Sequence, residues 1–157
     1  EDLLHNASNY DCAIIAIGNN SIRRQKQQQC IEAGVNIASF THPRASVSPL
    51  ADIGRGVVIL AGAVVNAFAV VGDACIINSN SVVEHDVKLS IGVHVCPGTN
   101  IAGGVEIGAE TWVGIGATVK QLVKIGSKVT IGAGATVIKD VTDNLTIVGS
   151  PAKPLMR

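Results

Sequence analysis

An aliphatic residue recurs at every sixth position through most of this chain. From Val47 to Val137, each sixth residue is Ile, Leu or Val, and the residue four places after each of these is small or β-branched. A period of six matches neither the 3.6-residue period of an α-helix nor the two-residue alternation of a strand. The series therefore indicates a repeated structural unit. Its members are Val47, Ile53, Ile59, Val65, Val71, Ile77, Val83, Leu89, Val95, Ile101, Ile107, Val113, Val119, Ile125, Ile131 and Val137.

Such a repeat predicts a mainly β, three-sided prism in which each unit forms one short strand and one corner. Residues 47–141 would form about five coils, stacked at about 4.8 Å per layer, with the aliphatic side chains inside. The composition agrees, because 47% of the residues are hydrophobic but only 3% are aromatic, which suits a narrow aliphatic core. The apolar stretch from Val57 to Val71 keeps the same phase, so we expect it in this core and expect no membrane insertion.

Glycine follows the aliphatic residue in several units, where a sharp turn or a close approach of a neighbouring coil would favour it. These glycines are Gly54, Gly72, Gly108, Gly114, Gly126 and Gly132. The combined pattern resembles the hexapeptide-repeat family. The resemblance implies a left-handed parallel β-helix and a homotrimer, whereas general crossover chirality would have favoured the opposite hand.

Residues 1–41 lie outside the repeat and are predicted to form part of a small Rossmann-like α/β domain. A turn rich in Gly and Asn before a helix can receive phosphates or sugar hydroxyls, although the same turn can be purely structural. Residues 42–46 are a linker and residues 142–157 a C-terminal tail, since Asp143 and Gly149 would break the inward positions. The expected elements are a buried strand over Tyr10 to Ile17, a turn over Gly18 to Asn20, a helix over Ser21 to Ala33 ended by Gly34, and a second strand over Val35 to Phe40.

Charge and cysteine content limit the classes of function. Twelve Lys and Arg residues balance twelve Asp and Glu residues, so no positive field exists to hold nucleic acid, and we expect no nucleic-acid partner. The four cysteines form no C-x-x-C pair, which predicts reduced thiols in a cytoplasmic protein. The polar residues 1–11 lack the basic start and apolar run of a signal peptide.

The clearest polar interruption of the repeat runs from Asn78 to Asp86. His85 lies two places after the inward residue Val83, so its imidazole is expected to point outward, between Glu84 and Asp86. A neighbouring carboxylate orients an imidazole and raises its pKa, as a general base near neutral pH requires. A solvated surface pair of His and Asp is the alternative interpretation.

His94 also lies off the inward positions, and a surface histidine is again the alternative to a functional one. Zinc in hexapeptide-repeat carbonic anhydrases needs three histidines, two of them close together on one flank. His5 and His42 lie outside the predicted coils, so we expect no metal site.

Several sequence words resemble the bacterial nucleotide-sugar acetyltransferases of the PglD/NeuD type, in order and spacing through nearly the whole chain. The resemblance implies transfer of acetyl from acetyl-CoA to the 4-amino group of a UDP-linked amino-dideoxy sugar of the bacillosamine type. It also implies a nucleotide-sugar substrate bound partly by residues 1–41, and active sites between the subunits of a homotrimer. The words are Ala16-Ile-Gly-Asn-Asn20 with Ile22-Arg23, Ser81-Val-Val-Glu-His-Asp86, His94-Val95, Ala102-Gly103, Ile107-Gly108 and Gly149-Ser-Pro-Ala-Lys153.

The same resemblance assigns roles to individual residues. His85 would be the general base, and Asp86, which stands where close members have Glu, would raise its basicity. The backbone N–H near Gly103 would be an oxyanion donor. The residues implied in binding acetyl-CoA are His94, Ile115, Ala133, which replaces a Gly of close members, and Gly103. Those implied in binding the nucleotide sugar are Gly18, Asn78 and Glu84.

Family members open with a strand and a turn of the G-x-G-G-H kind, which this chain does not contain. We therefore expect the sequence to be a fragment, because the apolar strand over 10–17 would otherwise be an unprotected edge. Two alternatives to the sugar N-acetyltransferase stay open. One is an O-acetyltransferase acting on sialic acid or another surface-polysaccharide sugar, and the other is a non-catalytic or metal-binding β-helix protein.

Overall fold

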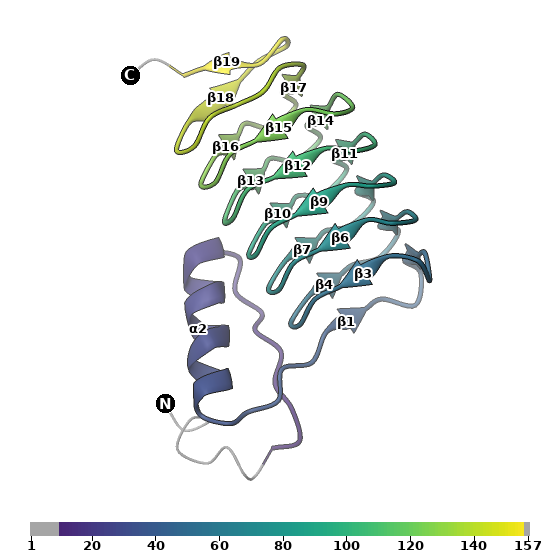
Figure 1. Ribbon diagram of the computed structural model, residues 1–157, viewed down its shortest axis with the longest axis vertical. Coiled ribbons are helices and arrows are strands. Elements are labelled where there is room, and N and C mark those ends of the chain that lie inside the picture. Colours follow the sequence, from purple (N-terminus) through teal and green to yellow (C-terminus); the bar gives the residue numbers. More distant parts are fainter. Residues whose placement is uncertain (1–9, 156–157) are drawn as a thin grey trace.

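The computed structural model describes residues 10–155, which form a parallel β-helix with one α-helix packed along its side (Figure 1). Its three faces are three sheets. Face 1 contains β1 (Phe40–Thr41), β4 (Val58–Ile59), β7 (Ile76–Ile77), β10 (His94–Val95), β13 (Trp112–Val113), β16 (Thr130–Ile131), β18 (Thr146–Val148) and β19 (Lys153–Pro154). Face 2 contains β2 (Ser46–Val47), β5 (Val64–Val65), β8 (Val82–Val83), β11 (Asn100–Ile101), β14 (Thr118–Val119) and β17 (Thr136–Val137). Face 3 contains β3 (Asp52–Ile53), β6 (Val70–Val71), β9 (Lys88–Leu89), β12 (Glu106–Ile107) and β15 (Lys124–Ile125).

Each coil visits the three faces in order, and each strand pairs in parallel with the strand one coil away. His94, for example, lies in register with Ile76 below it and Trp112 above it. The corner that follows face 1 along the chain is called the first corner, and those that follow faces 2 and 3 are the second and third corners. Only β19 departs from this pattern, because it pairs antiparallel with β18.

The core of the prism is the predicted aliphatic series. From Ile59 to Val137, every member of that series is at most 4% exposed. The small or β-branched residues four places further on, from Val57 to Ala135, are buried to the same degree. Two inward residues per unit therefore fill the prism, and the predicted phase of the repeat is confirmed.

The corners turn through a left-handed residue three places after each inward aliphatic residue. From Gly56 to Gly134 this position always has a positive φ, whether or not the residue is Gly. A non-glycine residue there carries a strain of about 1–2 kcal/mol, which the stacked coils must offset. The glycines that directly follow the inward aliphatic residues do not supply this turn, and instead allow neighbouring coils to approach closely. A Cβ at Gly72, for example, would lie 2.9 Å from the backbone nitrogen of Ile91 in the next coil.

The ladder of parallel strands extends beyond residues 47–141 at both ends. At the start, β1 pairs with β4, and the aliphatic period does not reveal it because Thr41 stands at the position in register with Ile59. At the end, β18 pairs with β16 and brings Ile147 next to Ile131. Ile147 is 2% exposed, so it continues the core after a coil that is two residues shorter than the others.

The α2 helix (Asn20–Glu32) confirms the predicted helix. The Asn19 side chain caps its N-terminus by accepting a hydrogen bond from the Ile22 backbone N–H at 3.0 Å. After the helix, Gly34 adopts a φ of +80°, which few other residues tolerate.

The predicted buried strand over 10–17 is wrong for the described structure. Ala13 forms a single parallel bridge with Ile37, while Tyr10 and Ile14 are 51% and 44% exposed. The second predicted strand over 35–40 likewise reduces to this bridge and to Phe40 of β1. Within residues 10–155 the 10–17 segment pairs only at this bridge, and Phe40 pairs with Val58 of β4; a single bridge is too little for a ladder.

The α2 helix packs along the third corner by polar contacts. Its buried residues are Asn20, Arg23, Gln27 and Cys30. None of the helices in the described range is long and apolar enough to cross a membrane. His5 and residues 1–9 of the predicted α/β domain lie outside the described residues.

Candidate active site

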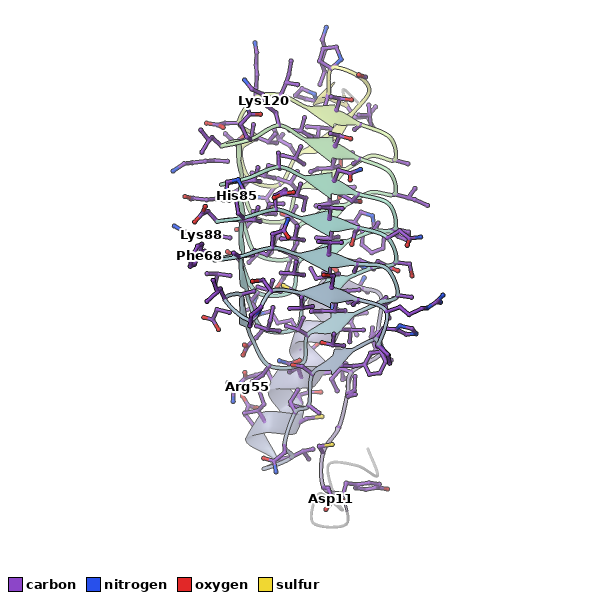
Figure 2. All side chains as sticks on the ribbon, turned by 90° about the vertical axis from the view of Figure 1, so that its right-hand side faces the viewer. Asp11, Arg55, Phe68, His85, Lys88 and Lys120 are labelled. Atoms are coloured by element: carbon purple, nitrogen blue, oxygen red, sulfur yellow. The ribbon has the colours of Figure 1, made fainter. Side chains whose placement is uncertain are left out.

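His85 and Asp86 form a hydrogen-bonded pair at the second corner, directly after β8. The His85 Nδ1 atom lies 2.8 Å from Asp86 Oδ2, and the two side chains are 63% and 61% exposed. Figure 2 shows His85 at the outer edge of the prism, on the same side as Phe68 and Lys120. Asp86 occupies the left-handed corner position, with a φ of +60°, and this conformation brings its carboxylate beside the preceding imidazole.

The hydrogen bond that the Asp86 carboxylate accepts from the ring raises the pKa of His85, and the charges of Asp86 and Glu84 add to the effect. A carboxylate accepts only, so His85 Nδ1 carries the proton and donates to it. The Nε2 atom is then the unprotonated nitrogen of the neutral ring. Glu84 Oε2 also accepts a hydrogen bond from the His85 backbone N–H at 3.2 Å. The pair thus presents a basic nitrogen to solvent.

Gly103 lies one coil above His85 and in direct contact with its ring. A Cβ at residue 103 would lie 2.6 Å from both Cε1 and Nε2 of His85, so only Gly leaves room for the imidazole in this position. Gly104 N–H donates to the His85 carbonyl at 2.9 Å, whereas Gly103 N–H donates to no acceptor within residues 10–155. A free N–H donor therefore lies close to the basic nitrogen.

His94 and Asn78 form a second group, on face 1 and at the start of the first corner. His94 is 6% exposed, so the alternative of a surface histidine is wrong. Its ring centroid lies 4.4 Å from that of Trp112, with the two rings tilted by 57°. Its Nε2 lies 3.1 Å from Asn78 Nδ2, which donates to it. Gly18, in the loop before α2, lies beside the His94 ring, and Asn78 is only partly buried.

Burial lowers the pKa of His94 to about 4, and the positive charge of Arg23 contributes in the same direction. His94 is therefore neutral near pH 7. Its Nδ1 atom is buried and makes no hydrogen bond of standard geometry within residues 10–155, although the Gly18 backbone is close enough to oppose the pKa shift. His94 is thus a positioned neutral ring, unlike the exposed and basic His85.

Ile115 and Ala133 lie above Asn78 in one column along the first corner. Gly134 N–H donates to the Ile115 carbonyl at 2.8 Å, which stacks the two corners on each other. Both side chains are exposed, Ile115 by 58%. The structure therefore sorts the predicted residues into two groups. The group at the second corner consists of Glu84, His85, Asp86 and Gly103. The group on face 1 and the first corner consists of Asn78, His94, Ile115 and Ala133, with Gly18 beside His94. Face 2 separates the two groups.

Two residues near the second group were not predicted. Trp112 lines a cavity of about 580 Å³ together with Asn19, Ser21, Lys128 and Thr130. It is the single Trp of the chain and stands at an outward strand position, and these two features could have marked it as a candidate binding residue. Arg23 is completely buried, and nothing in its polar helical segment indicated that.

Within residues 10–155 no three His, Cys, Asp or Glu side chains come together as a group that could hold a metal ion. His85 and His94 lie on different sides of face 2 and cannot share one. Cys75 and Cys96 are buried, and burial raises the pKa of their thiols to about 12 and about 11, so neither is poised as a nucleophile.

The pH response of His85 provides a direct check of this geometry. Replacing Asp86 with Asn removes the main cause of the raised pKa, so we expect the His85 pKa to fall towards its ordinary value, as followed by NMR titration of its ring. Glu84→Gln is the matched control and should lower it less, because Glu84 acts on the ring through charge alone. An unchanged pKa in Asp86→Asn would mean that the pair does not form.

No family model matches the chain. Solved structures are nevertheless very similar. The acetyltransferase domain of PglB from Neisseria gonorrhoeae FA1090 is 42% identical, with a TM-score of 0.94 over 98% of this chain and 76% of that one. Its complex with acetyl coenzyme A matches at 40% identity and a TM-score of 0.93, over 97% of this chain and 76% of that one.

A third match is a histidine-to-alanine variant of GDP-perosamine N-acetyltransferase from Caulobacter crescentus, in complex with CoA and GDP-perosamine. It is 33% identical, with a TM-score of 0.97 over 100% of this chain and 76% of that one. The chain belongs to the hexapeptide-repeat sugar N-acetyltransferases. This confirms the predicted left-handed β-helix, the resemblance to the PglD/NeuD type and the assignment as an acetyl-CoA-dependent acetyltransferase.

Proposed function

We propose that this sugar N-acetyltransferase transfers acetyl from acetyl-CoA to the 4-amino group of a nucleotide-linked amino-dideoxy sugar, with His85 as the general base. The observation that carries the proposal is the arrangement at the second corner. A carboxylate-oriented imidazole presents its unprotonated Nε2 beside the free N–H of Gly103. Acylation of an amine needs both groups, one to accept a proton and one to stabilise an oxyanion.

In the proposed reaction the sugar amine attacks the thioester carbonyl carbon. His85 Nε2 accepts the proton that the amine loses as the C–N bond forms, and Asp86 stabilises the resulting imidazolium. The Gly103 N–H donates to the oxygen that becomes negative in the tetrahedral intermediate. Collapse of the intermediate breaks the C–S bond, and the CoA thiolate takes the proton back from His85.

The donor would lie along the other group of residues. The exposed column of Ile115 and Ala133 offers an apolar strip parallel to the prism axis, and the buried His94 stands near its lower end. A pantetheine arm is long and mostly apolar, so it fits such a strip. Gly18, Asn78 and Glu84 are proposed to contact the nucleotide sugar.

Face 2 separates the proposed base from the proposed donor strip, so one chain does not hold a whole site. We propose that the chains form a homotrimer in which the second corner of one chain faces the first corner of its neighbour. Large exposed apolar side chains along the second corner support this packing, since Leu50, Phe68 and Leu122 are 59%, 60% and 73% exposed. The proposal also places the protein in the cytoplasm, where its substrates are made.

Subunit mixing tests this arrangement. We expect His85→Ala and Ile115→Glu chains each to be inactive alone, the second because a carboxylate repels and obstructs the anionic donor. Randomly mixed trimers, made by co-expression, should recover about a quarter of the wild-type activity, because each site needs an intact corner from each of two chains. Mixed trimers without activity would show that both corners act within one chain.

The substrate class is tested by an acetylation assay with UDP-linked and GDP-linked 4-amino-dideoxy sugars, followed by thiol release and by the mass of the product. The Caulobacter enzyme is solved with a GDP-linked amino sugar, so both nucleotides belong in the assay. Acetylation of the amine supports the proposal. Acetylation only of a hydroxyl, with sialic acid or a similar sugar, would favour the O-acetyltransferase instead.

A further inference from the structure

Arg23 of α2 is the largest completely buried side chain among residues 10–155. A guanidinium has five N–H donors, and all five are used. Nε donates to the Ala74 carbonyl at 2.7 Å. Nη1 donates to the carbonyls of Ile17 and Gly18, and Nη2 to Asn20 Oδ1 and the Gly92 carbonyl, each at 2.9 Å.

No carboxylate forms an ion pair with Arg23 in the part of the chain that the structure describes. Burying an unpaired charge is costly even when it is hydrogen-bonded, and burial lowers the pKa of Arg23 accordingly. A helix can be attached to a β-helix at lower cost by apolar side chains. Attachment of the helix alone therefore does not explain an Arg at this position. The backbone carbonyls that its guanidinium binds provide the explanation.

The guanidinium joins both sides of the His94 environment. Gly92 is two residues before His94 and leads into β10, and Gly18 belongs to the loop that lies beside the His94 ring. The hydrogen bonds to these two carbonyls set the distance between the loop and the strand. His94 in turn accepts the hydrogen bond from Asn78, which is proposed to contact the sugar.

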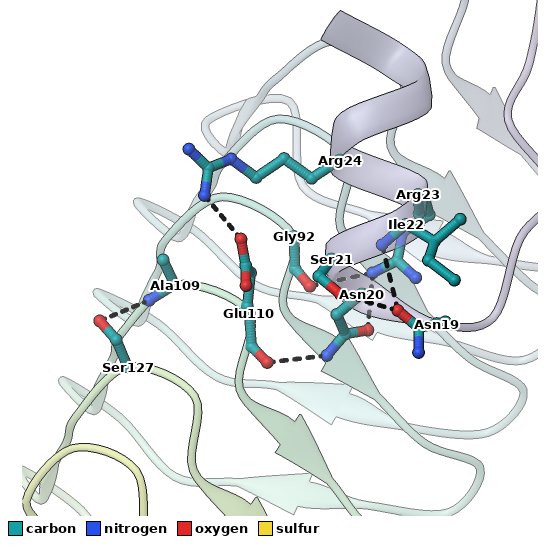
Figure 3. A network of polar contacts seen from close by, with 10 residues as sticks. All are labelled: Asn19, Asn20, Ser21, Ile22, Arg23, Arg24, Gly92, Ala109, Glu110 and Ser127. Carbon is teal, nitrogen blue, oxygen red and sulfur yellow. Dashed lines mark hydrogen bonds and ion pairs between the residues drawn. The ribbon is translucent and has the colours of Figure 1, made fainter.

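Asn20 extends the same connection to the next coil. Its Oδ1 accepts from Arg23, which fixes the orientation of the amide, and its Nδ2 donates to the Glu110 carbonyl at 3.0 Å (Figure 3). The same Nδ2 also donates to the Thr111 carbonyl at 3.2 Å. These residues lead directly into Trp112, the aromatic neighbour of His94. Asn20 and Trp112 both line the cavity of about 580 Å³.

We propose that Arg23, together with Asn20, is a positioning residue that holds the loop over residues 17–20 against His94 and Trp112 and so shapes the nucleotide-sugar side of the site. The inference rests on the proposed function and adds to it a determinant of sugar binding distinct from the base and the donor strip. Neither Arg23 nor Asn20 forms a hydrogen bond with Ile115 or Ala133, so we expect the donor strip above His94 to depend on them less than the sugar side does.

The test separates binding of the two substrates in the full chain. Arg23→Lys keeps the charge but cannot donate five hydrogen bonds, and we expect it to raise the KM for the nucleotide sugar at least about tenfold while the Kd for acetyl-CoA changes less than about threefold. Arg23→Gln should behave in the same way. Arg24→Gln is the matched control, because the neighbouring Arg24 is half exposed and only pairs with Glu110 at the surface; its sugar KM should stay within about twofold.

All variants are assayed below the lowest melting temperature in the set. If the Arg23 variants do not fold, Asn20→Ala replaces them, since it leaves the backbone contacts of Arg23 in place, and the same rise in sugar KM is expected. A folded Arg23→Lys or Asn20→Ala protein with an unchanged sugar KM would overturn the inference while the proposed function stands. A wild-type chain that acetylates no amino sugar would defeat the proposed function and this inference together.

Discussion

His85→Ala should lower kcat by roughly two to four orders of magnitude, the range expected when a general base is removed. The side chain is largely exposed, and its contacts are with the exposed Asp86 and with Gly103, so the melting temperature should stay close to that of the wild type. Steady-state kinetics with the nucleotide sugar and acetyl-CoA, together with thermal unfolding, measure both quantities.

The KM for acetyl-CoA is the internal control in this experiment. It should change little, because donor binding is proposed to depend on the strip at Ile115 and Ala133, whereas His85 is proposed to act on the amine that attacks the thioester. His85→Gln serves as a matched variant, since its side chain retains polarity without a basic nitrogen and should be as impaired as His85→Ala. A near-normal kcat in both variants would remove His85 from the mechanism.

Val95→Asp is expected to abolish folding. Val95 is 0% exposed in β10, and its inward position is surrounded by aliphatic side chains. Burying an unpaired carboxylate costs several kcal/mol, which is comparable with the whole stability of a small domain, about 5–15 kcal/mol. The yield of soluble protein and its circular dichroism give the readout.

Val70→Asp provides the comparison for this second variant. The substitution is identical and also lies in a two-residue strand, β6, but Val70 points outward and is 41% exposed. The neighbouring outward position in that sheet is already an Asp, Asp52. We therefore expect Val70→Asp to fold. If Val95→Asp folded equally well, the assignment of inward and outward positions would be incorrect.

The core could be predicted from sequence because a period of six allows very few packings. Each inward residue faces the same surroundings one coil later, so the aliphatic requirement repeats without interruption from Ile59 to Val137. The left-handed corner residues were not predicted. Gly stands at half of these positions, but residues as different as Phe68, Asp86 and Leu122 stand at others despite the strain. Residue type alone therefore does not mark the position, and the stacking of the coils imposes the conformation.

The ends of the prism were harder to predict for a different reason. Thr41 stands where the period would need an aliphatic residue, and Ile147 arrives two residues early. In both cases pairing with an existing sheet edge determines the structure, and local sequence pattern contributes little. The prediction of a strand over 10–17 was wrong because this apolar segment forms only one bridge, at Ala13, within the described residues.

At the candidate site, the environment of His85 could be predicted from the sequence and that of His94 could not. The pairing of His85 with Asp86 follows from adjacent positions at one corner, so it could be predicted. The burial of His94 depends on a loop more than 70 residues earlier, which Arg23 attaches through backbone carbonyls. Every residue has a carbonyl acceptor, so the sequence does not indicate which carbonyls an arginine will bind.

Calorimetric titration of acetyl-CoA into the full chain, with free CoA as comparison, tests whether the coils bind the acetyl donor. The donor strip and the proposed catalytic pair lie within the coils described here, so binding of the donor depends on the residues discussed. We expect saturable binding with about one site per chain, retained in His85→Ala and lost in Ile115→Glu. A folded wild-type protein that binds neither acetyl-CoA nor CoA, or binding that survives Ile115→Glu unchanged, would contradict this expectation.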